Sequence, residues 1–231
     1  MRVPPSVSVI VPVFNEGLLL EESLAQMDRF LTQHFPDYEI LVIESGSTDG
    51  SDALCDRMAR GNPKIRVIHE GARKGLGAAV RLGFTRASKD LVWVIASDIP
   101  FSLESFLRAV PLLRDHDCVL SYRAKDPRSL YRRFQSWVYN LLVKQCLGLR
   151  CRSVNSAFKV FKRPVLQVLK LRSSGWLWDA EVLYRLQEKG IACAEIPVEL
   201  VDRRPGRSSV GPMDFLSVLR ELVHFMKTKN S

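Results

Sequence analysis

Apolar runs alternate with helix-periodic segments through the first half of the chain. Runs rich in Val and Ile, such as 7–13 and 91–95, predict buried strands. Segments such as 18–34 carry Leu or Met three and four residues apart, which predicts helices with one apolar face. The strands expected in this half are 7–13, 38–43, 65–69, 91–95 and 118–122, and the helices are 18–34, 51–60, 76–87 and 102–113. This alternation is typical of a mainly parallel α/β sheet with helices on both faces.

The second half is less regular. A long helix is expected at 129–147, and Arg163-Pro164 marks the start of another because Pro suits the first turn of a helix. Gly190 is expected to end a further helix. The remaining elements expected are a strand at 157–161, a helix at 179–189, an extended run at 192–201 and a helix at 212–227. No internal repeat or linker interrupts the pattern, so residues 1–231 are expected to form a single domain.

Composition places the chain among globular proteins, with 46% hydrophobic and 26% charged residues. No apolar stretch approaches the roughly 18–20 residues that span a bilayer, and the N-terminus lacks a signal-peptide core. The five cysteines form no CxxC pair, which predicts reduced thiols in a cytoplasmic protein. The four histidines are scattered without metal-ligand spacing, which disfavours a zinc site.

The formal net charge of +9 favours an anionic partner. A nucleotide diphosphate, a lipid phosphate, an anionic membrane and a nucleic acid all fit this charge. Solvated lysines with no partner would explain it equally well. Charge alone therefore leaves the class of partner open.

Polar segments follow three of the predicted strands. Asn15 and Glu16 follow the first, Glu44 and Asp49 the second, and Asp98 the fourth. Ligands of open α/β sheets bind outside the carboxyl ends of the strands, so these side chains predict a polar pocket at one edge. An alternative interpretation is that they are ordinary helix starts, turns and caps.

The order of these motifs resembles that of the family 2 glycosyltransferases, and most closely the dolichol-phosphate mannose synthase-like sugar transferases that use polyprenyl phosphates. Segment 12–16 resembles the family's Pro-x-Tyr-Asn-Glu, and 44–50 resembles Asp-Asp-Gly-Ser-Thr-Asp-Gly. The resemblance implies a GT-A (Rossmann-like) three-layer sandwich, with nucleotide-sugar binding in about 1–123 and acceptor binding in about 124–231. The nucleotide-sugar residues that it implies are Pro12, Phe14, Asn15, Glu16, Glu44, Ser45, Lys74, Ser97, Asp98, Arg203, Arg207 and Ser208.

One departure concerns the metal site. Where the family usually has Asp-Ala-Asp, this chain has Ala96-Ser97-Asp98. The resemblance implies that Mg²⁺ or Mn²⁺ is held by Asp98 alone, weakly and with help from the diphosphate oxygens. Ser209 also replaces a family lysine, although Arg207 can supply part of the charge that neutralises a leaving diphosphate.

The acceptor half begins with a basic, Trp-containing amphipathic segment at 128–147. The resemblance implies that the acceptor phosphate is bound by Arg123 together with Arg132 or Arg133. Such a helix suits a membrane surface, and the alternative is that its apolar stripe packs on the sheet. The stripe consists of Leu130, Phe134, Trp137, Val138, Leu141 and Leu142.

The function implied is inverting transfer of a sugar from a GDP- or UDP-sugar to a polyprenyl phosphate. Asp98, Arg203 and Glu181 are the implied catalytic residues, and either Asp179 or Glu181 could orient the sugar or a loop. The protein is expected at the cytoplasmic face of a membrane, bound peripherally to the lipid surface or to a small membrane protein, and without nucleic acid.

Two alternatives stay open. A pseudo-glycosyltransferase that binds nucleotide or a partner without turnover would explain the loss of the first Asp of the metal motif. A family 2 transferase with a soluble acceptor would need a general base, for which Asp179 and Glu181 are the candidates.

Overall fold

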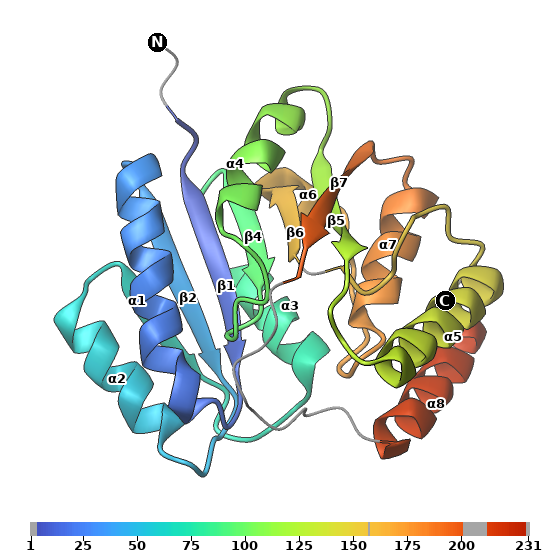
Figure 1. The fold of residues 1–231 in the computed structure, drawn as a ribbon, viewed down its shortest axis with the longest axis horizontal. Coiled ribbons are helices and arrows are strands. Elements are labelled where there is room, and N and C mark those ends of the chain that lie inside the picture. The colour runs from blue at the N-terminus through green and yellow to red at the C-terminus, as the bar shows by residue number, and fades with distance from the viewer. Residues whose placement is uncertain (1–3, 157, 201–211, 230–231) are drawn as a thin grey trace.

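Seven strands form one sheet in the computed structural model, which describes residues 4–156, 158–200 and 212–229, without the side chains of 18 and 212–216. The strand order is β3-β2-β1-β4-β6-β5-β7 (Figure 1). All neighbouring strands are parallel except that β6 runs antiparallel to both β4 and β5. The strands are β1 (Val7–Val13), β2 (Tyr38–Glu44), β3 (Ile65–His69), β4 (Leu91–Ile95), β5 (Cys118–Lys125), β6 (Phe158–Lys162) and β7 (Cys193–Glu199).

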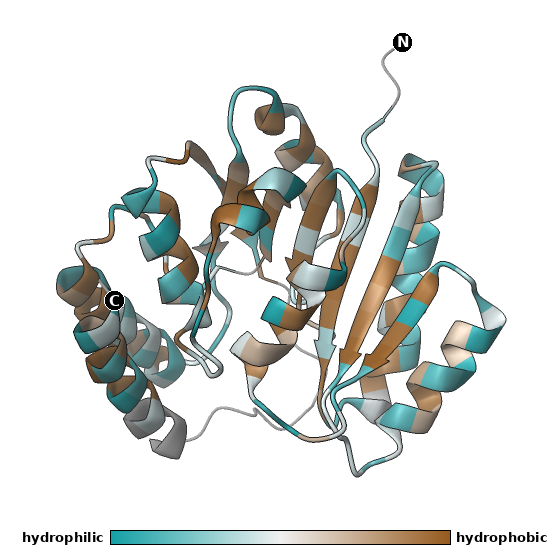
Figure 2. Ribbon diagram, turned by 180° about the vertical axis from the view of Figure 1, so that it is seen from behind, coloured by the Kyte–Doolittle hydropathy of each residue, from teal (hydrophilic) through white to brown (hydrophobic). Residues whose placement is uncertain are grey.

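Helices cover both faces of the sheet. One layer contains α1 (Gly17–His34), α2 (Ser51–Gly61), α4 (Glu104–Ala109) and the 3₁₀ helix η1 (Val110–Arg114). The other contains α3 (Leu76–Arg86), α5 (Leu130–Leu147), α6 (Arg163–Val168), α7 (Trp178–Glu188) and α8 (Pro212–Thr228). The hydrophobic strands lie between these layers (Figure 2). The mainly parallel three-layer sandwich expected from the sequence is therefore confirmed.

Alternate residues of each central strand enter the two separate cores. In β1, Val9 and Val11 pack in the core beneath α1, whereas Ile10 packs in the core beneath α3. Trp93 of β4 stacks on Phe106 of α4 with ring centroids 4.2 Å apart, which fixes α4 on its face of the sheet. Strands buried on both faces explain the continuous Val and Ile runs of the sequence.

The helix expected at 102–113 is divided into two. α4 ends at Ala109, and η1 continues the chain because Pro111 has no backbone N–H to donate to an α-helix. Ser102 does not cap this helix, since its hydroxyl donates to the Glu104 carboxylate instead. Ser129 does cap α5 by accepting a hydrogen bond from the backbone N–H of Arg132 at 3.4 Å.

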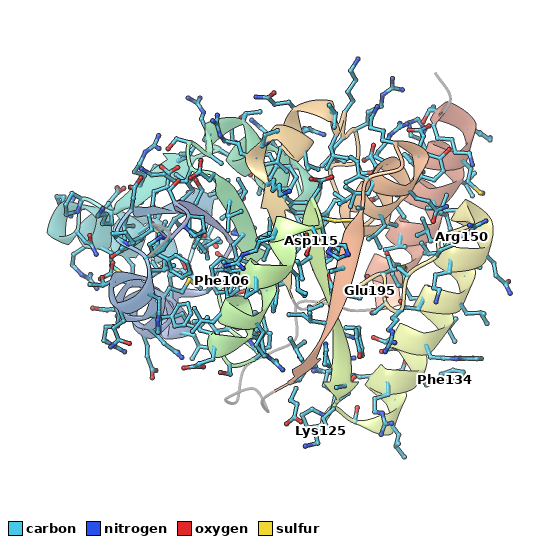
Figure 3. All side chains as sticks on the ribbon, turned by 90° about the horizontal axis from the view of Figure 1, so that it is seen from above. Phe106, Asp115, Lys125, Phe134, Arg150 and Glu195 are labelled. Carbon is cyan, nitrogen blue, oxygen red and sulfur yellow. A yellow bond between two sulfur atoms is a disulfide. The ribbon has the colours of Figure 1, made fainter. Side chains whose placement is uncertain are left out.

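A disulfide between Cys118 and Cys193 corrects the expectation of five reduced thiols. The two residues face each other in the β5–β7 register with Cα atoms 4.8 Å apart, and Figure 3 shows the sulfur–sulfur bond. The bond ties edge strand β7 to β5. Seventy-five positions separate the two cysteines in the sequence, so only the strand pairing brings them together. Cys55, Cys146 and Cys151 are free thiols.

Reduction of this disulfide should destabilise the protein. Opening a cross-link of this separation removes about 2–4 kcal/mol of stability, chiefly by freeing the unfolded chain. Urea unfolding followed by circular dichroism should show a lower midpoint for the wild type in reductant. Cys193→Ala is the matched control, because its midpoint should not respond to reductant. Equal wild-type midpoints with and without reductant would contradict the assignment.

Candidate functional site

The polar segments expected to form a pocket meet at one edge of the sheet. Parallel pairing places Val13 opposite Glu44 and Glu44 opposite His69, so the carboxyl ends of β1, β2 and β3 are level. β4 runs parallel to β1 and delivers Asp98 to the same edge. The topology thus brings together the first three motifs that the sequence singled out.

Asn15 joins the loop after β1 to the loop after β2. Its side-chain oxygen accepts a hydrogen bond from the backbone N–H of Thr48 at 2.8 Å, and its own N–H donates to the Ser47 hydroxyl at 3.0 Å. Asn15 also has a φ of 55°, a left-handed conformation that Asn tolerates better than most residues. Asn15 and Ser47 therefore fix the two loops relative to each other.

Asp49 and Ser51 satisfy the backbone at the start of α1. The Ser51 hydroxyl accepts from the N–H of Glu16 at 3.0 Å, and the Asp49 carboxylate accepts from the N–H of Gly17 at 3.1 Å. Burial alone raises the pKa of Asp49, but hydrogen bonds from the Ser51 hydroxyl and the Gly17 N–H outweigh it and lower the pKa. The cap interpretation of Asp49 is confirmed, with the difference that it serves α1 as well as α2.

Glu44 is a buried carboxylate with both oxygens bonded. One oxygen accepts from the N–H of Ser47 at 2.6 Å and the other lies 2.9 Å from Nδ1 of His69. Burial alone raises the pKa of Glu44, but these hydrogen bonds outweigh it and lower the pKa. The same contact, with one from Asp56 to Nε2, raises the pKa of His69. Nucleoside binding by Glu44 stays a prediction, and His69 is a site residue that the scattered histidines of the sequence did not indicate.

Phe14 and Arg73 form a pair above these loops. The Arg73 guanidinium lies 4.3 Å from the centre of the Phe14 ring, a cation–π contact between the segment after β1 and the segment after β3. Lys74 is exposed beside this pair, whereas Ser45 is buried and donates its hydroxyl to Glu70 at 2.7 Å. An aromatic ring with two cations beside it suits a nucleoside diphosphate.

The N-terminus of α3 is closed by another part of the chain. The N–H groups of Gly77 and Ala78 donate to the carbonyls of Gly175 and Ser174 at 3.2 and 3.0 Å. A side chain at Gly75 would collide with the Ser174 carbonyl, so glycine is required there. These N–H groups are therefore occupied by the segment 172–177, termed here the 172–177 loop, and not by a phosphate.

Glu181 holds the 172–177 loop in place. This side chain is fully buried, and its carboxylate accepts hydrogen bonds from the backbone N–H of Arg172 at 2.9 Å and of Ser173 at 2.7 Å. Of the two roles expected for Glu181, orienting a loop agrees with these contacts. A direct catalytic role stays a prediction that its burial does not support.

Asp179 lies two residues before Glu181 on α7 and points to a different side of the helix. It forms an ion pair with Lys159 of β6, whose side chain is only 2% exposed and lies 4.9 Å from the centre of the Trp178 ring. Burial raises the pKa of Asp179, although the charges of Lys159 and Arg123 oppose the shift. Asp179 of α7, Lys159 of β6 and Arg123 of β5 thus make one electrostatic group.

Arg123 and Arg128 donate hydrogen bonds to the same hydroxyl. The sequence led us to expect Arg132 or Arg133 beside Arg123 instead. The Arg123 guanidinium donates to the Ser136 hydroxyl of α5 at 3.1 Å, and Arg128 donates to the same oxygen at 3.2 Å. Arg128 also forms a two-pronged ion pair with Asp126, and this pairing lowers the pKa of Asp126. Arg132 and Arg133 lie in the first turn of α5, and their phosphate-binding role stays a prediction.

The Ala96-Ser97-Asp98 segment offers a divalent metal little protein coordination. Ala96 is exposed, Ser97 is buried and Asp98 is partly buried. Within residues 4–156, 158–200 and the described side chains of the last helix, no three His, Cys, Asp or Glu are grouped as metal ligands. One carboxylate suits Mg²⁺ or Mn²⁺ only where diphosphate and water oxygens complete the shell. Arg203, Arg207 and Ser208 lie outside the described residues.

Comparisons with known proteins agree with this geometry. A family model described as glycosyl transferase family 2 matches residues 8–169. Glycosyltransferase AglD of Haloferax volcanii is 29% identical over 205 residues, which are 84% of this chain but only 32% of that protein. Undecaprenyl-phosphate mannosyltransferase of Micrococcus luteus is 24% identical over 88% of this chain and 87% of its own length. The chain therefore spans about a third of the first relative and most of the second.

Solved structures share the fold. Glucosyl-3-phosphoglycerate synthase from Mycobacterium tuberculosis, in complex with Mn²⁺, UDP and glucosyl-3-phosphoglycerate, superposes with a TM-score of 0.69 at 22% identity, covering 95% of this chain and 77% of that one. Mannosyltransferase PcManGT from Pyrobaculum calidifontis, in complex with GDP-Man and Mn²⁺, gives 0.64 at 22% identity, covering 99% and 73%. The GT-A fold expected from the sequence is confirmed.

The contacts of Glu181 predict a structural effect of its loss. Glu181→Ala should lower the free energy of unfolding by about 3 kcal/mol, because two backbone N–H groups lose a charged acceptor. Glu188→Ala is the matched control on the same helix: Glu188 pairs with Arg185 near the surface, and its loss should cost less than about 1 kcal/mol. Urea unfolding measures both, and equal effects would contradict the role given to Glu181.

The Glu44–His69 contact predicts a pH dependence. The lowered pKa of Glu44 stabilises the fold above a pH of about 4.3 and loses effect as the pH falls through that pKa. The raised pKa of His69 stabilises it below about 6.5 and loses effect as the pH rises through that pKa. The stability difference between wild type and His69→Gln should therefore be largest near pH 5–6 and shrink towards about pH 9.

Urea unfolding of both proteins across this pH range measures the difference. His224→Gln is the matched control, since His224 is an exposed residue on α8. A difference for His69→Gln that stays constant from acid to alkaline pH would contradict the assigned contact.

Proposed function

Because the chain belongs to glycosyl transferase family 2, we propose that it transfers a sugar, with inversion, from a nucleotide-diphosphate sugar to a polyprenyl phosphate. The donor side of the proposal is supported by the interlocked loops after β1 and β2 and by the Phe14–Arg73 pair beside them. The neighbouring structures with UDP and GDP-Man support a nucleotide-sugar donor of either base.

The choice of acceptor rests on the surroundings of the two candidate general bases, Asp179 and Glu181. Asp179 is engaged by Lys159, and Glu181 is buried against backbone N–H groups. A sugar or alcohol acceptor needs a base to take its proton, whereas a phosphate monoester is already an anion at neutral pH. This supports an anionic acceptor over a neutral soluble one, and the Micrococcus relative, named for undecaprenyl phosphate, supports a lipid.

The chemistry then depends on position and charge. An oxygen of the acceptor phosphate forms a bond to the anomeric carbon as the bond from that carbon to the diphosphate breaks, and negative charge gathers on the diphosphate. Arg123 and Arg128, joined through Ser136, provide cations for the acceptor phosphate. Asp98 would hold a divalent ion, which when bound offsets charge on the diphosphate. Lys74, which is exposed beside the Phe14–Arg73 pair, provides a cation for the diphosphate of the donor.

Transfer activity tests the proposal directly. Purified protein is incubated with labelled GDP- and UDP-sugars and a short polyprenyl phosphate dispersed in detergent, with and without Mn²⁺. We expect a labelled lipid product, and Asp98→Asn should reduce its formation by at least about 100-fold. Ala96→Asp restores the carboxylate at an exposed position and should lower the Mn²⁺ concentration required.

Arg123→Ala separates the two substrates. It should raise the KM for the lipid phosphate and leave nucleotide affinity unchanged in calorimetry. Arg57→Ala, which removes an exposed ion pair with Glu21, is the matched control. Nucleotide binding without transfer of any sugar would overturn the proposal in favour of a protein that binds nucleotide without turnover.

A further inference from the structure

Helix α5 carries two apolar stripes, and only one faces the core. Tyr139, Val143 and Leu147 recur every four residues and are buried in the core on this face of the sheet, where α5 contacts α8. The second stripe recurs at intervals of four, three and four residues and is exposed to solvent. Its members, with their exposed fractions, are Leu130 (79%), Phe134 (60%), Trp137 (59%) and Leu141 (42%). The alternative that this stripe packs on the sheet is therefore wrong for these four residues.

The exposed stripe belongs to a larger surface. In the described part of the chain, all the large apolar side chains exposed to solvent lie on α5 or α8 except Val168 of α6. α5 and α8 pack side by side, and Phe134 lies on the outward side of α5 (Figures 1 and 3). The outer face, as it is called below, consists of Leu130, Tyr131, Phe134, Trp137 and Leu141 of α5 with Val223 and Met226 of α8.

The rings of Phe134 and Trp137 stack on each other at the surface. Their centroids are 6.0 Å apart with the planes inclined by 28°, so the two exposed rings form one contiguous apolar patch. Contiguous apolar patches of this kind are rare on monomeric soluble proteins and mark a surface that meets a membrane or another protein.

The charge of the segment around α5 favours a membrane over a second copy of the chain as the partner of the outer face. Residues 127–178, which include α5, contain eleven Lys or Arg and no Asp or Glu, although the whole chain has 25 acidic residues. A second copy of the chain, docked through the same face, would set this cationic segment against itself. Basic side chains beside Trp, Tyr, Phe and Leu on one helix are instead the composition of a helix that lies in the interface of an anionic bilayer.

We propose that the outer face binds an anionic lipid surface, with the first half of α5 lying in the boundary between headgroups and acyl chains and α8 beside it. Among the helices that the structure describes, none could span a bilayer. Arg123 and Arg128 bond to Ser136 on this same helix, so the contact would bring the arginines that the proposed function gives to the acceptor phosphate close to the lipid headgroups. The purpose of the contact rests on the proposed function, but the binding itself requires neither nucleotide nor acceptor.

Vesicle sedimentation without nucleotide or polyprenyl phosphate tests the contact. The full chain should bind vesicles of phosphatidylglycerol and phosphatidylcholine, bind pure phosphatidylcholine much more weakly, and lose affinity between 0.05 and 0.5 M salt. Phe134→Ala and Trp137→Ala should each weaken binding roughly tenfold, because each ring loses its burial in lipid.

The matched control is Val168→Ala, since Val168 is 44% exposed but lies on α6, outside the outer face. It should bind vesicles as the wild type does. Quenching of tryptophan fluorescence by brominated lipid gives a second measurement: it should be strong in the wild type and clearly reduced in Trp137→Phe, because Trp93 and Trp178 are buried and Trp176, which is partly buried, lies outside the outer face.

Three outcomes would overturn the proposal. They are no binding to anionic vesicles at low salt, binding only to vesicles that contain membrane proteins, and self-association in sedimentation velocity that Trp137→Ala abolishes. Transfer to a detergent-dispersed acceptor separates this inference from the proposed function. Transfer without vesicle binding would reject the lipid contact alone, and vesicle binding without transfer would reject the proposed function alone.

Discussion

The buried carboxylate of Glu181 is the contact on which the second helical layer depends. It accepts hydrogen bonds from backbone N–H groups of the 172–177 loop. Carbonyls of the same loop accept hydrogen bonds from N–H groups at the start of α3. Glu221 of α8 accepts a further hydrogen bond from the N–H of Leu177 at 3.0 Å. Helices α3, α7 and α8, which are far apart in sequence, are thus joined through one short loop. The position of Arg73 and Lys74, just before α3, follows from that junction.

Most of the fold could be predicted from the sequence because the signals are local. Val and Ile runs and helical spacing located every described strand and helix, although the break at Pro111 divided one helix in two. The strand order, the antiparallel direction of β6 and the Cys118–Cys193 bond could not be predicted. Each depends on which strands pair, and pairing between distant segments leaves no periodic trace in the sequence.

In the candidate site, too, the sequence located residues but not the contacts between their side chains. The sequence placed Glu44 and Asp98 at strand ends, but it did not indicate that His69 would occupy one oxygen of Glu44. Asp179 and Glu181 could not be told apart from the sequence because both lie in the first turn of the same helix. Residues two positions apart on an α-helix point in directions that differ by about 200°. The carboxylate of Asp179 therefore meets Lys159, and that of Glu181 meets backbone N–H groups. The contacts of α7 with β6 and with the 172–177 loop decide these roles.

Helix α5 shows what helical periodicity in the sequence does not predict, namely which apolar stripe faces the core. The residues that form the more hydrophobic stripe by sequence, including Phe134 and Trp137, are the ones that face water, while Tyr139 and Val143 face the core. Helical spacing identifies an apolar stripe but does not say what covers it. An apolar stripe left in water by the folded chain gains stability only from a second environment, and the lack of Asp and Glu in residues 127–178, which include α5, favours an environment of negative charge. The same helix therefore serves two contacts, one that stabilises the fold and one that the fold leaves available.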